Sequence, residues 1–248
     1  MTQGYEAEVQ IFDDDREMAA AAADLVAKLC EEAIRRRGRF LIALSGGEAP
    51  RGLYAVLASP AYRERVIWPK MEVFWVDERC VPPDHPDSNY RLAADLLLSK
   101  VPVPESQIHR IEGERDPAAE ADVYGREVSA YMPKSLFTFD LAILGMGADG
   151  HTAALFPGDA AVSVTNKVAV PVERQGQQHR RITLTLPVLN HAAAALFLVT
   201  GAEKAAAVRE ILDEGNPKAY PAGLVTPKQG ELHWFLDRQA ASLLSDGE

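Results

Sequence analysis

The chain alternates short apolar runs with longer stretches that have the residue spacing of amphipathic helices. Short apolar runs between such helices are typical of strands that are buried on both faces. A strand, a helix and a further strand in succession favour parallel pairing, because the helix returns the chain to the same end of the sheet. We therefore expect an α/β fold, a three-layer α/β/α arrangement with a mostly parallel, Rossmann-like sheet and helices on both faces. No repeat, low-complexity tract or clear linker interrupts the pattern, so we expect a single domain over residues 1–248.

Apolar runs and period-2 alternation predict the strands, of which the first suits an edge of the sheet. They are Glu8–Phe12, Phe40–Leu44, Met71–Val76, Gln107–Ile111, Leu141–Leu144, Lys167–Val172, Arg181–Leu186, Ala194–Val199 and Glu231–Leu236. Capping residues, prolines and glycines bound the predicted helices. These run from Asp13–Asp15 to about Arg37, from Pro50, over Asn89–Leu98 and Pro117–Tyr131, as a short turn at Pro187–His191, from a capping box at Thr200–Glu203 to about Leu212, and from Asp237.

The composition excludes several classes of partner. A formal net charge of −10 argues against nucleic acid as the main partner, although it leaves room for a basic pocket and a small anionic ligand. The chain has neither an uncharged apolar stretch of about 18 residues nor an N-terminal apolar segment, so we expect no membrane span, no signal peptide and a cytoplasmic protein. Two cysteines offer neither a disulfide framework nor a metal-ligand pattern.

The predicted strand Leu141–Leu144 breaks into a turn with three glycines and the triplet Asp149-Gly150-His151. Glycines let backbone N–H groups approach a ligand closely, and ligands of open α/β sheets bind at the carboxyl ends of the strands. Asp149 could orient His151, whose imidazole can move a proton near neutral pH. The alternative is a glycine-rich turn with a solvated aspartate and histidine, and we favour the functional interpretation.

A second junction of this kind follows the strand Phe40–Leu44. Ser45, Gly46 and Gly47 lead into a helix that begins at Pro50. Free N–H groups, the positive end of the helix dipole and a hydroxyl together suit a phosphate group. A plain β–α turn explains the same residues, and this junction alone does not decide between the two.

Charged residues at other element ends point to the same edge of the sheet. Asp77-Glu78-Arg79 ends a buried strand, where charges are unfavourable unless they are paired or used. Lys204 lies in the first turn of a helix, where a bound anion would offset its unfavourable interaction with the dipole. Arg181 begins a strand, so it would join the others only if that strand runs antiparallel or its preceding loop folds over. The loop Pro82–Asp87 suits either a lid or a surface excursion.

These groups suit acid–base chemistry on a small phosphorylated molecule. Asp77, Asp149 and His151 supply the acid–base capacity, and arginine, lysine and a helix N-terminus suit a phosphate dianion. No metal-ligand set is evident at recognisable spacing. The absence of Gly-x-Ser-x-Gly argues against a covalent serine mechanism.

Several of these segments together resemble one known family. LSGGEAPRGLY, VFWVDERCVPPDHPDSNYR, LGMGADGHTAALFPG, RITLTLP and the helix with Lys204 are similar to 6-phosphogluconolactonases and occur in the order of that family. The resemblance implies hydrolysis of 6-phospho-D-glucono-1,5-lactone to 6-phospho-D-gluconate in the oxidative pentose phosphate pathway. It also implies a three-layer α/β fold and no required cofactor. As partners we expect a small phosphorylated sugar lactone, no nucleic acid and no membrane, and we expect a monomer or small homo-oligomer.

The resemblance also assigns roles to residues. His151 would be the general base that activates water against the lactone carbonyl and then returns the proton to the ring oxygen. Asp149 and Asp77 would orient His151 or the sugar hydroxyls, and Arg79 would bind the phosphate or steady the oxyanion. The phosphate cradle would consist of Ser45, Gly46, Gly47, Arg181 and Lys204.

One departure from the family and two rival functions remain. The family usually has two hydroxyl residues where this chain has Glu48 and Ala49, so we expect the Glu48 carboxylate to point away from the phosphate. Related glucosamine-6-phosphate deaminases carry a glutamate five residues after the histidine, where this chain has Phe156, which argues against a sugar-phosphate deaminase or isomerase. A non-catalytic sugar-phosphate sensor usually carries a DNA-binding segment, for which we find no pattern.

Overall fold

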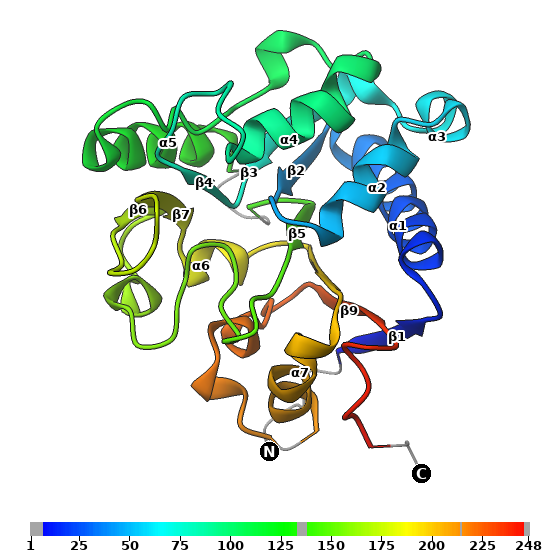
Figure 1. Ribbon diagram of the computed structural model, residues 1–248. Helices are drawn as coiled ribbons and strands as arrows, with labels where there is room; N and C mark the ends of the chain where they lie inside the picture. Colours follow the sequence, from blue (N-terminus) through cyan, green and yellow to red (C-terminus); the bar gives the residue numbers. More distant parts are fainter. Residues whose placement is uncertain (1–6, 133–137, 214, 246–248) are drawn as a thin grey trace.

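The computed structural model describes residues 7–132, 138–213 and 215–245, which form two sheets with helices around them (Figure 1). The larger sheet has six strands, and every neighbouring pair in it is parallel. In spatial order they are β1 (Glu8–Phe12), β9 (Glu231–Asp237), β8 (Ala194–Val199), β5 (Leu141–Leu144), β2 (Phe40–Leu44) and β3 (Met71–Trp75). The predicted parallel α/β sheet is confirmed, and β1 lies at an edge as expected.

Helices flank the six-stranded sheet (Figure 1). They are α1 (Asp15–Arg37), α2 (Ala49–Leu57), α3 (Pro60–Arg65), α4 (Asn89–Leu96), α5 (Pro117–Tyr131), α6 (Leu186–Leu189) and α7 (Ala205–Leu212). β2, β5 and β8 are buried along their whole length, because helices cover both of their faces. None of the helices in the described residues is both long enough and apolar enough to cross a bilayer.

Local signals fix the ends of α1 as the sequence predicts. The Asp14 carboxylate accepts hydrogen bonds from the backbone N–H groups of Arg16 (2.8 Å) and Glu17 (2.9 Å). At the other end Gly38 adopts φ 75°, a left-handed conformation that favours glycine, and donates its N–H to Ile34 at 2.8 Å. These caps satisfy backbone groups that the ends of a helix leave without partners.

A second sheet of three antiparallel strands was not expected from the sequence as a separate unit. It consists of β4 (Asp77–Arg79), β7 (Arg181–Leu184) and β6 (Ala169–Val172) in the order β4-β7-β6. Val76 joins the two sheets, since its N–H donates to Leu44 (2.9 Å) and its carbonyl accepts from Leu184 (2.8 Å). Because β7 runs antiparallel to β4, Arg181 lies directly opposite Arg79, which meets the condition set for Arg181 above.

Three predicted elements were wrong. The expected strand Gln107–Ile111 is an irregular segment, which touches β3 through one bond from His109 N–H to Val73 O (2.8 Å). The expected helix from Asp237 does not form in the described residues, where β9 extends to Asp237 and turns follow. The capping box at Thr200–Glu203 does not form either.

The polar side chains in these segments have other partners, which explains the errors. The Asp237 carboxylate accepts hydrogen bonds from Ala240 N–H (2.6 Å) and Gly201 N–H (3.1 Å), so it ties two segments together instead of starting a helix. Glu203 forms an ion pair with Lys204 at 3.3 Å. The turn η5 (Ala202–Lys204) therefore precedes α7 without a side-chain cap.

Candidate active site

A cavity of about 300 Å³ lies where the carboxyl ends of β2, β5 and β8 meet the small sheet. It is lined by eight of the nine residues that the sequence singles out: Ser45, Gly46, Gly47, Asp77, Arg79, His151, Arg181 and Lys204. The ninth, Asp149, contacts the imidazole of His151. The topology therefore brings together residues from five separate segments of the chain. It also adds residues that sequence patterns did not single out, including Asn89, Thr200 and Ala153.

His151 and Asp149 form a hydrogen-bonded pair in the turn after β5. Nδ1 of His151 lies 2.5 Å from Oδ1 of Asp149, and the His151 backbone N–H donates to the same oxygen at 3.2 Å. The carboxylate accepts a hydrogen bond from Nδ1–H, so Nε2 is the ring nitrogen left with a lone pair in the neutral imidazole. Since His151 lines the cavity, this tautomer supplies a base there.

The surroundings of Asp149 favour the ionised form of its carboxylate. Partial burial acts to raise its pKa, but the hydrogen bond from His151 and the guanidinium of Arg174 outweigh this, so the pKa of Asp149 falls below its ordinary value. Nη1 of Arg174 lies 3.6 Å from Oδ2 of Asp149. The carboxylate therefore stays ionised and holds the imidazole in one orientation.

The glycine turn is shaped to fit this pair. An added Cβ at Gly147 would overlap the imidazole of His151 and lie 2.8 Å from Oδ1 of Asp149. The N–H of Gly147 donates to the carbonyl of His151 at 2.9 Å, and the hydroxyl of Thr152 donates to the carbonyl of Gly145 at 2.8 Å. Gly147 is therefore required by a close approach, and the turn is closed by its own hydrogen bonds.

The Ser45-Gly46-Gly47 loop leads into α2 on the opposite wall of the cavity. No side chain caps the N-terminus of α2, and Pro50 occupies its first turn. N–H groups at such an end are available to an anion. The Glu48 side chain is 85% exposed and pairs with Arg51 at 3.1 Å, so its carboxylate points away as expected. The backbone part of the cradle is therefore intact.

Asp77 contacts Arg181 and Asn89. Its buried carboxylate lies 3.7 Å from Nη1 of Arg181 and accepts a hydrogen bond from Nδ2 of Asn89 at 3.3 Å. Of the two aspartates considered as orienters of His151, Asp149 makes the contact. Asp77 instead contacts Arg181, and it lies on the cavity wall.

Glu78 is structural. It is buried, and its carboxylate accepts bonds from the N–H groups of Asn89 (2.7 Å) and Tyr90 (2.8 Å) and from the Ser88 hydroxyl (3.0 Å). Burial raises the pKa of Glu78 above its ordinary value, against the effect of these bonds. Glu78 therefore fixes the start of α4, which holds Asn89 against Asp77.

Arg79 and Arg181 bring two guanidinium groups to the cavity. Nη1 of Arg79 donates to the Asp87 carbonyl at 2.7 Å, and Nη2 of Arg181 donates to Gln177 at 3.1 Å. The Nε atoms of both arginines are buried and have no hydrogen-bond partner among the described residues. Both arginines line the cavity, where the positive charge of their guanidinium groups suits an anionic ligand.

An aromatic ring lies behind the histidine. The Phe156 ring is buried, with its centroid 4.5 Å from that of His151, and the guanidinium of Arg174 lies 4.6 Å from it. Phe156 occupies the position where the related deaminases are expected to carry a glutamate. Arg174 was not singled out from the sequence, because nothing in the polar segment Glu173–His179 indicates that it folds back onto Asp149.

The fold and the cavity define a class of protein: a parallel α/β protein whose strand ends carry a His–Asp pair beside donors for a small anion. Comparison with known proteins gives the family. The model of glucosamine-6-phosphate isomerases/6-phosphogluconolactonase matches residues 13–234. A 6-phosphogluconolactonase of a Synechocystis species is 43% identical over 218 residues, which cover 86% of this chain and 88% of that protein.

Two further matches cover nearly all of the chain. The 6-phosphogluconolactonase of Rattus norvegicus is 39% identical over 241 residues, which cover 96% of this chain and 93% of that protein. The structure of 6-phosphogluconolactonase from Trypanosoma brucei matches with a TM-score of 0.86 at 27% identity and covers 98% of this chain and 100% of that one. The chain therefore belongs to the glucosamine-6-phosphate isomerase/6-phosphogluconolactonase family.

Proposed function

We propose that this chain hydrolyses 6-phospho-D-glucono-1,5-lactone to 6-phospho-D-gluconate, the lactonase step of the oxidative pentose phosphate pathway. One observation supports it above the others: His151, with its Nδ1 held by Asp149, lines the same cavity as the positively charged Arg79 and Arg181. A base and an anion site in one small cavity suit a phosphorylated substrate whose reaction needs a proton acceptor.

The phosphate end of the substrate binds at the cradle. Backbone N–H groups of Gly46 and Gly47 and the N-terminus of α2 supply neutral donors, and Arg181 and Lys204 supply positive charge. Burial lowers the pKa of Arg181 below its ordinary value. The negative charge of Asp77 acts to raise this pKa, and the positive charge of Arg79 lowers it further. A dianionic phosphate offsets the repulsion between Arg79 and Arg181. The positive charge that is unfavourable in the empty cavity therefore favours binding of the phosphorylated substrate.

The hydrolytic step uses His151 twice. Nε2 takes a proton from water as its oxygen attacks the lactone carbonyl, which gives a tetrahedral oxyanion. The bond to the ring oxygen then breaks, and the imidazolium returns its proton to that oxygen as it leaves as a hydroxyl. Arg79 lies on the cavity wall where it can stabilise the oxyanion, and Asp149 stabilises the imidazolium. General acid–base catalysis of this kind contributes roughly 10²–10⁴-fold.

Phe156 separates this reaction from deamination. Ring opening of an amino sugar in the deaminases relies on the glutamate that supports the histidine, and here an apolar ring packs against His151 at 4.5 Å. Aldonolactone hydrolysis needs no such second carboxylate, because the lactone is already an activated ester.

Acid release from freshly generated lactone tests the proposal, measured against the spontaneous rate. We expect the wild-type protein to be fast and His151→Ala to lose at least ~100-fold in kcat, the low end of the range for a general base. His191→Gln, which changes an exposed histidine outside the cavity, is the matched control and should keep the wild-type rate.

Two other results would contradict the proposal. Wild-type protein that binds 6-phosphogluconate without accelerating acid release would be a sensor. Ammonia release from glucosamine 6-phosphate, without lactone hydrolysis, would make it a deaminase.

A further inference from the structure

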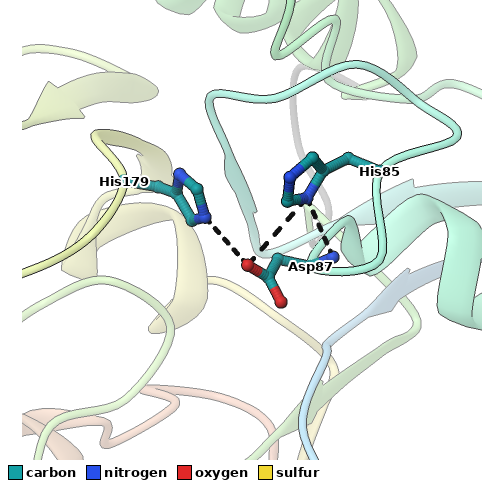
Figure 2. Close-up of side chains that lie close together, drawn as sticks. All are labelled: His85, Asp87 and His179. Atoms are coloured by element: carbon teal, nitrogen blue, oxygen red, sulfur yellow. Dashed lines mark hydrogen bonds and ion pairs between the residues drawn. The ribbon is translucent and has the colours of Figure 1, made fainter.

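Three side chains that are far apart in the sequence converge on one point outside the cavity (Figure 2). His85 and Asp87 lie in the loop between β4 and α4, and His179 lies in the turn between β6 and β7. One nitrogen of each histidine and one carboxylate oxygen of Asp87 all lie within 4.8 Å of one another. We propose that His85, Asp87 and His179 form a binding site for a divalent transition-metal ion of the Zn²⁺ class.

The donor set defines the kind of ion. Two imidazoles and one carboxylate suit Zn²⁺ and its transition-metal neighbours, whereas Ca²⁺ and Mg²⁺ prefer sites built from oxygen alone. Three protein ligands leave one tetrahedral position to water. The three side chains are half-buried, so solvent and ions can reach them.

The geometry is close to that of a bound site. Nε2 of His179 lies 2.8 Å from Oδ2 of Asp87, and Nδ1 of His85 lies 3.9 Å from the same oxygen. Ligands about 2.0–2.2 Å from a tetrahedral ion are roughly 3.3 Å apart, so the site forms with small rotations of the side chains. Nδ1 of His85 also accepts a hydrogen bond from the backbone N–H of Asp87 at 3.1 Å. Metal binding through this nitrogen replaces that hydrogen bond.

The backbone that carries the ligands is held from both sides. The Asp87 carbonyl accepts a hydrogen bond from Nη1 of Arg79 at 2.7 Å, and the Asp84 carbonyl accepts one from Nη1 of Arg91 at 2.7 Å. Across the gap, the Arg180 carbonyl next to His179 accepts the N–H of Cys80 at 2.8 Å. Two loops are therefore aligned before any ion binds, which lowers the entropy lost on binding.

A metal ion at this point would join the two loops that border the active-site cavity. Arg79 stands at the base of one loop and Arg181 at the base of the other, whereas none of the three ligands lines the cavity. The ion therefore has a structural role, in which it fixes the positions of the two arginines. The site and its test are independent of the proposed lactonase activity.

Metal binding to the chelator-treated full-length protein tests this directly. Isothermal titration with Zn²⁺ should show one bound equivalent, and Co²⁺ should give the intense visible absorption of a tetrahedral site. His179→Gln and His85→Gln should each weaken Zn²⁺ binding at least as much as the ~10–100-fold typical of lost outer-shell partners. The control His191→Gln should bind as the wild type does.

The thermal transition gives a second readout that does not depend on activity. Zn²⁺ in excess should raise the Tm of the wild-type protein and leave that of His179→Gln unchanged, because only a native-state site stabilises. Circular dichroism identifies a variant that fails to fold, and the other histidine variant then decides the question.

Three outcomes would overturn the site. Unchanged Zn²⁺ affinity in both histidine variants would make the binding adventitious. Equal affinity for Ca²⁺ would contradict the nitrogen ligands. A thiolate-to-Co²⁺ charge-transfer band would assign the ion to Cys80 instead of the three proposed ligands.

Discussion

Among single residues, the cations of the cavity differ in what each can contribute. Lys204 is a compact positive charge, and its ammonium forms an ion pair with the exposed carboxylate of Glu203 at 3.3 Å. Arg181 is more constrained, since it is held by Asp77 and Gln177. A flexible ammonium can follow a phosphate oxygen, whereas the guanidinium fixes the direction from which the phosphate is approached.

Lys204→Ala should raise KM for the lactone and leave kcat within a few-fold of the wild type. In the proposed binding mode Lys204 contacts the phosphate, which does not change between substrate and transition state. Steady-state kinetics of acid release measure both constants. Lys167→Ala, which removes an exposed lysine paired with Asp122, is the control. A fall in kcat with an unchanged KM would instead place Lys204 at the reacting carbon.

Residue types near strand ends were enough to predict eight residues of the cavity wall, but not the contacts between them. Ser45, Asp77 and His151 follow apolar runs, and parallel strands bring such positions to one edge. Which aspartate meets the histidine could not be predicted, because both stand at strand ends and only the observed turn geometry places Asp149 at 2.5 Å. Arg174 was missed because its partner Asp149 belongs to a different loop.

At the scale of elements, the turn after β5 shows how closely backbone and site are matched. The side chains of Asp149 and His151 fold back over Gly147, where even a methyl group has no room. The preceding glycine of the same turn, Gly145, has no heavy atom within 4 Å of an added Cβ and no left-handed backbone. Alanine substitutions at Gly147 and Gly145 therefore form a matched pair of test and control.

Gly147→Ala should lower kcat by at least ~10-fold while the protein stays folded, because displacement of the imidazole by about 1 Å is enough to spoil the attack geometry. Gly145→Ala should keep kcat, with any effect confined to KM. Activity and circular dichroism of the two variants measured in parallel decide this. Equal kcat values for both variants would show that the His–Asp pair tolerates movement.

A buried histidine links two other elements. Both ring nitrogens of His109 contact carboxylates, Nε2 at 2.9 Å from Glu72 of β3 and Nδ1 at 2.7 Å from Glu127 of α5, and the ring stacks on Phe74. Burial acts to lower the pKa of His109, but the two carboxylates outweigh it, so its pKa is raised above the ordinary value. The imidazolium is thus the favoured form, with an N–H for each carboxylate.

This pKa shift predicts how stability changes with pH. A folded-state pKa above that of the unfolded chain contributes stability that is fully present below about pH 6.5 and is lost as the pH rises through the folded value. The free energy of unfolding should therefore fall from pH 6 to pH 9, and it should fall less in His109→Gln. Urea unfolding across this range, with His191→Gln as control, measures it. Parallel curves for the wild type and His109→Gln would remove His109 as the cause.

The errors in element prediction have local causes. The segment Gln107–Ile111 has the composition of a strand, but it packs beside β3 through a single backbone hydrogen bond, while His109 uses its side chain to reach Glu72 and Glu127. At Asp237 a good helix-capping residue is used to join β9 to the turn at Gly201. In both cases a tertiary partner outweighs the local pattern.

For the molecule as a whole, the cavity lies between two sheets that are joined at Val76. His151, Ser45 and Lys204 come from the side of the six-stranded sheet, and Arg79 and Arg181 come from the three-stranded one. The parallel sheet could be predicted, since recognisable helices separate most of its strands along the chain. The small antiparallel sheet could not, because β4 consists of three charged residues, Asp77-Glu78-Arg79, which have no strand pattern and follow β3 after the single residue Val76.

A ligand that contacts both sheets should stabilise the whole protein. At about 100 times its Kd, 6-phosphogluconate should add about 2.7 kcal/mol, which raises Tm by about 5–10 °C for a chain of this size. Gluconate without phosphate should give a much smaller shift, and so should 6-phosphogluconate with Arg181→Ala. Differential scanning calorimetry measures these shifts. Equal shifts from gluconate and 6-phosphogluconate would exclude the phosphate as the anchoring group.

The pairing of β1 with β9 has a consequence for the order of events when the chain is made. Glu8 lies opposite His233, and among the described residues the only strand beside β1 is β9, which follows it by more than 200 residues. A nascent chain must therefore hold β1, with the exposed Val9 and Ile11, unpaired until β9 has been made. An unpaired strand invites pairing with other chains, so β1 is the segment where chaperones or aggregation would act first.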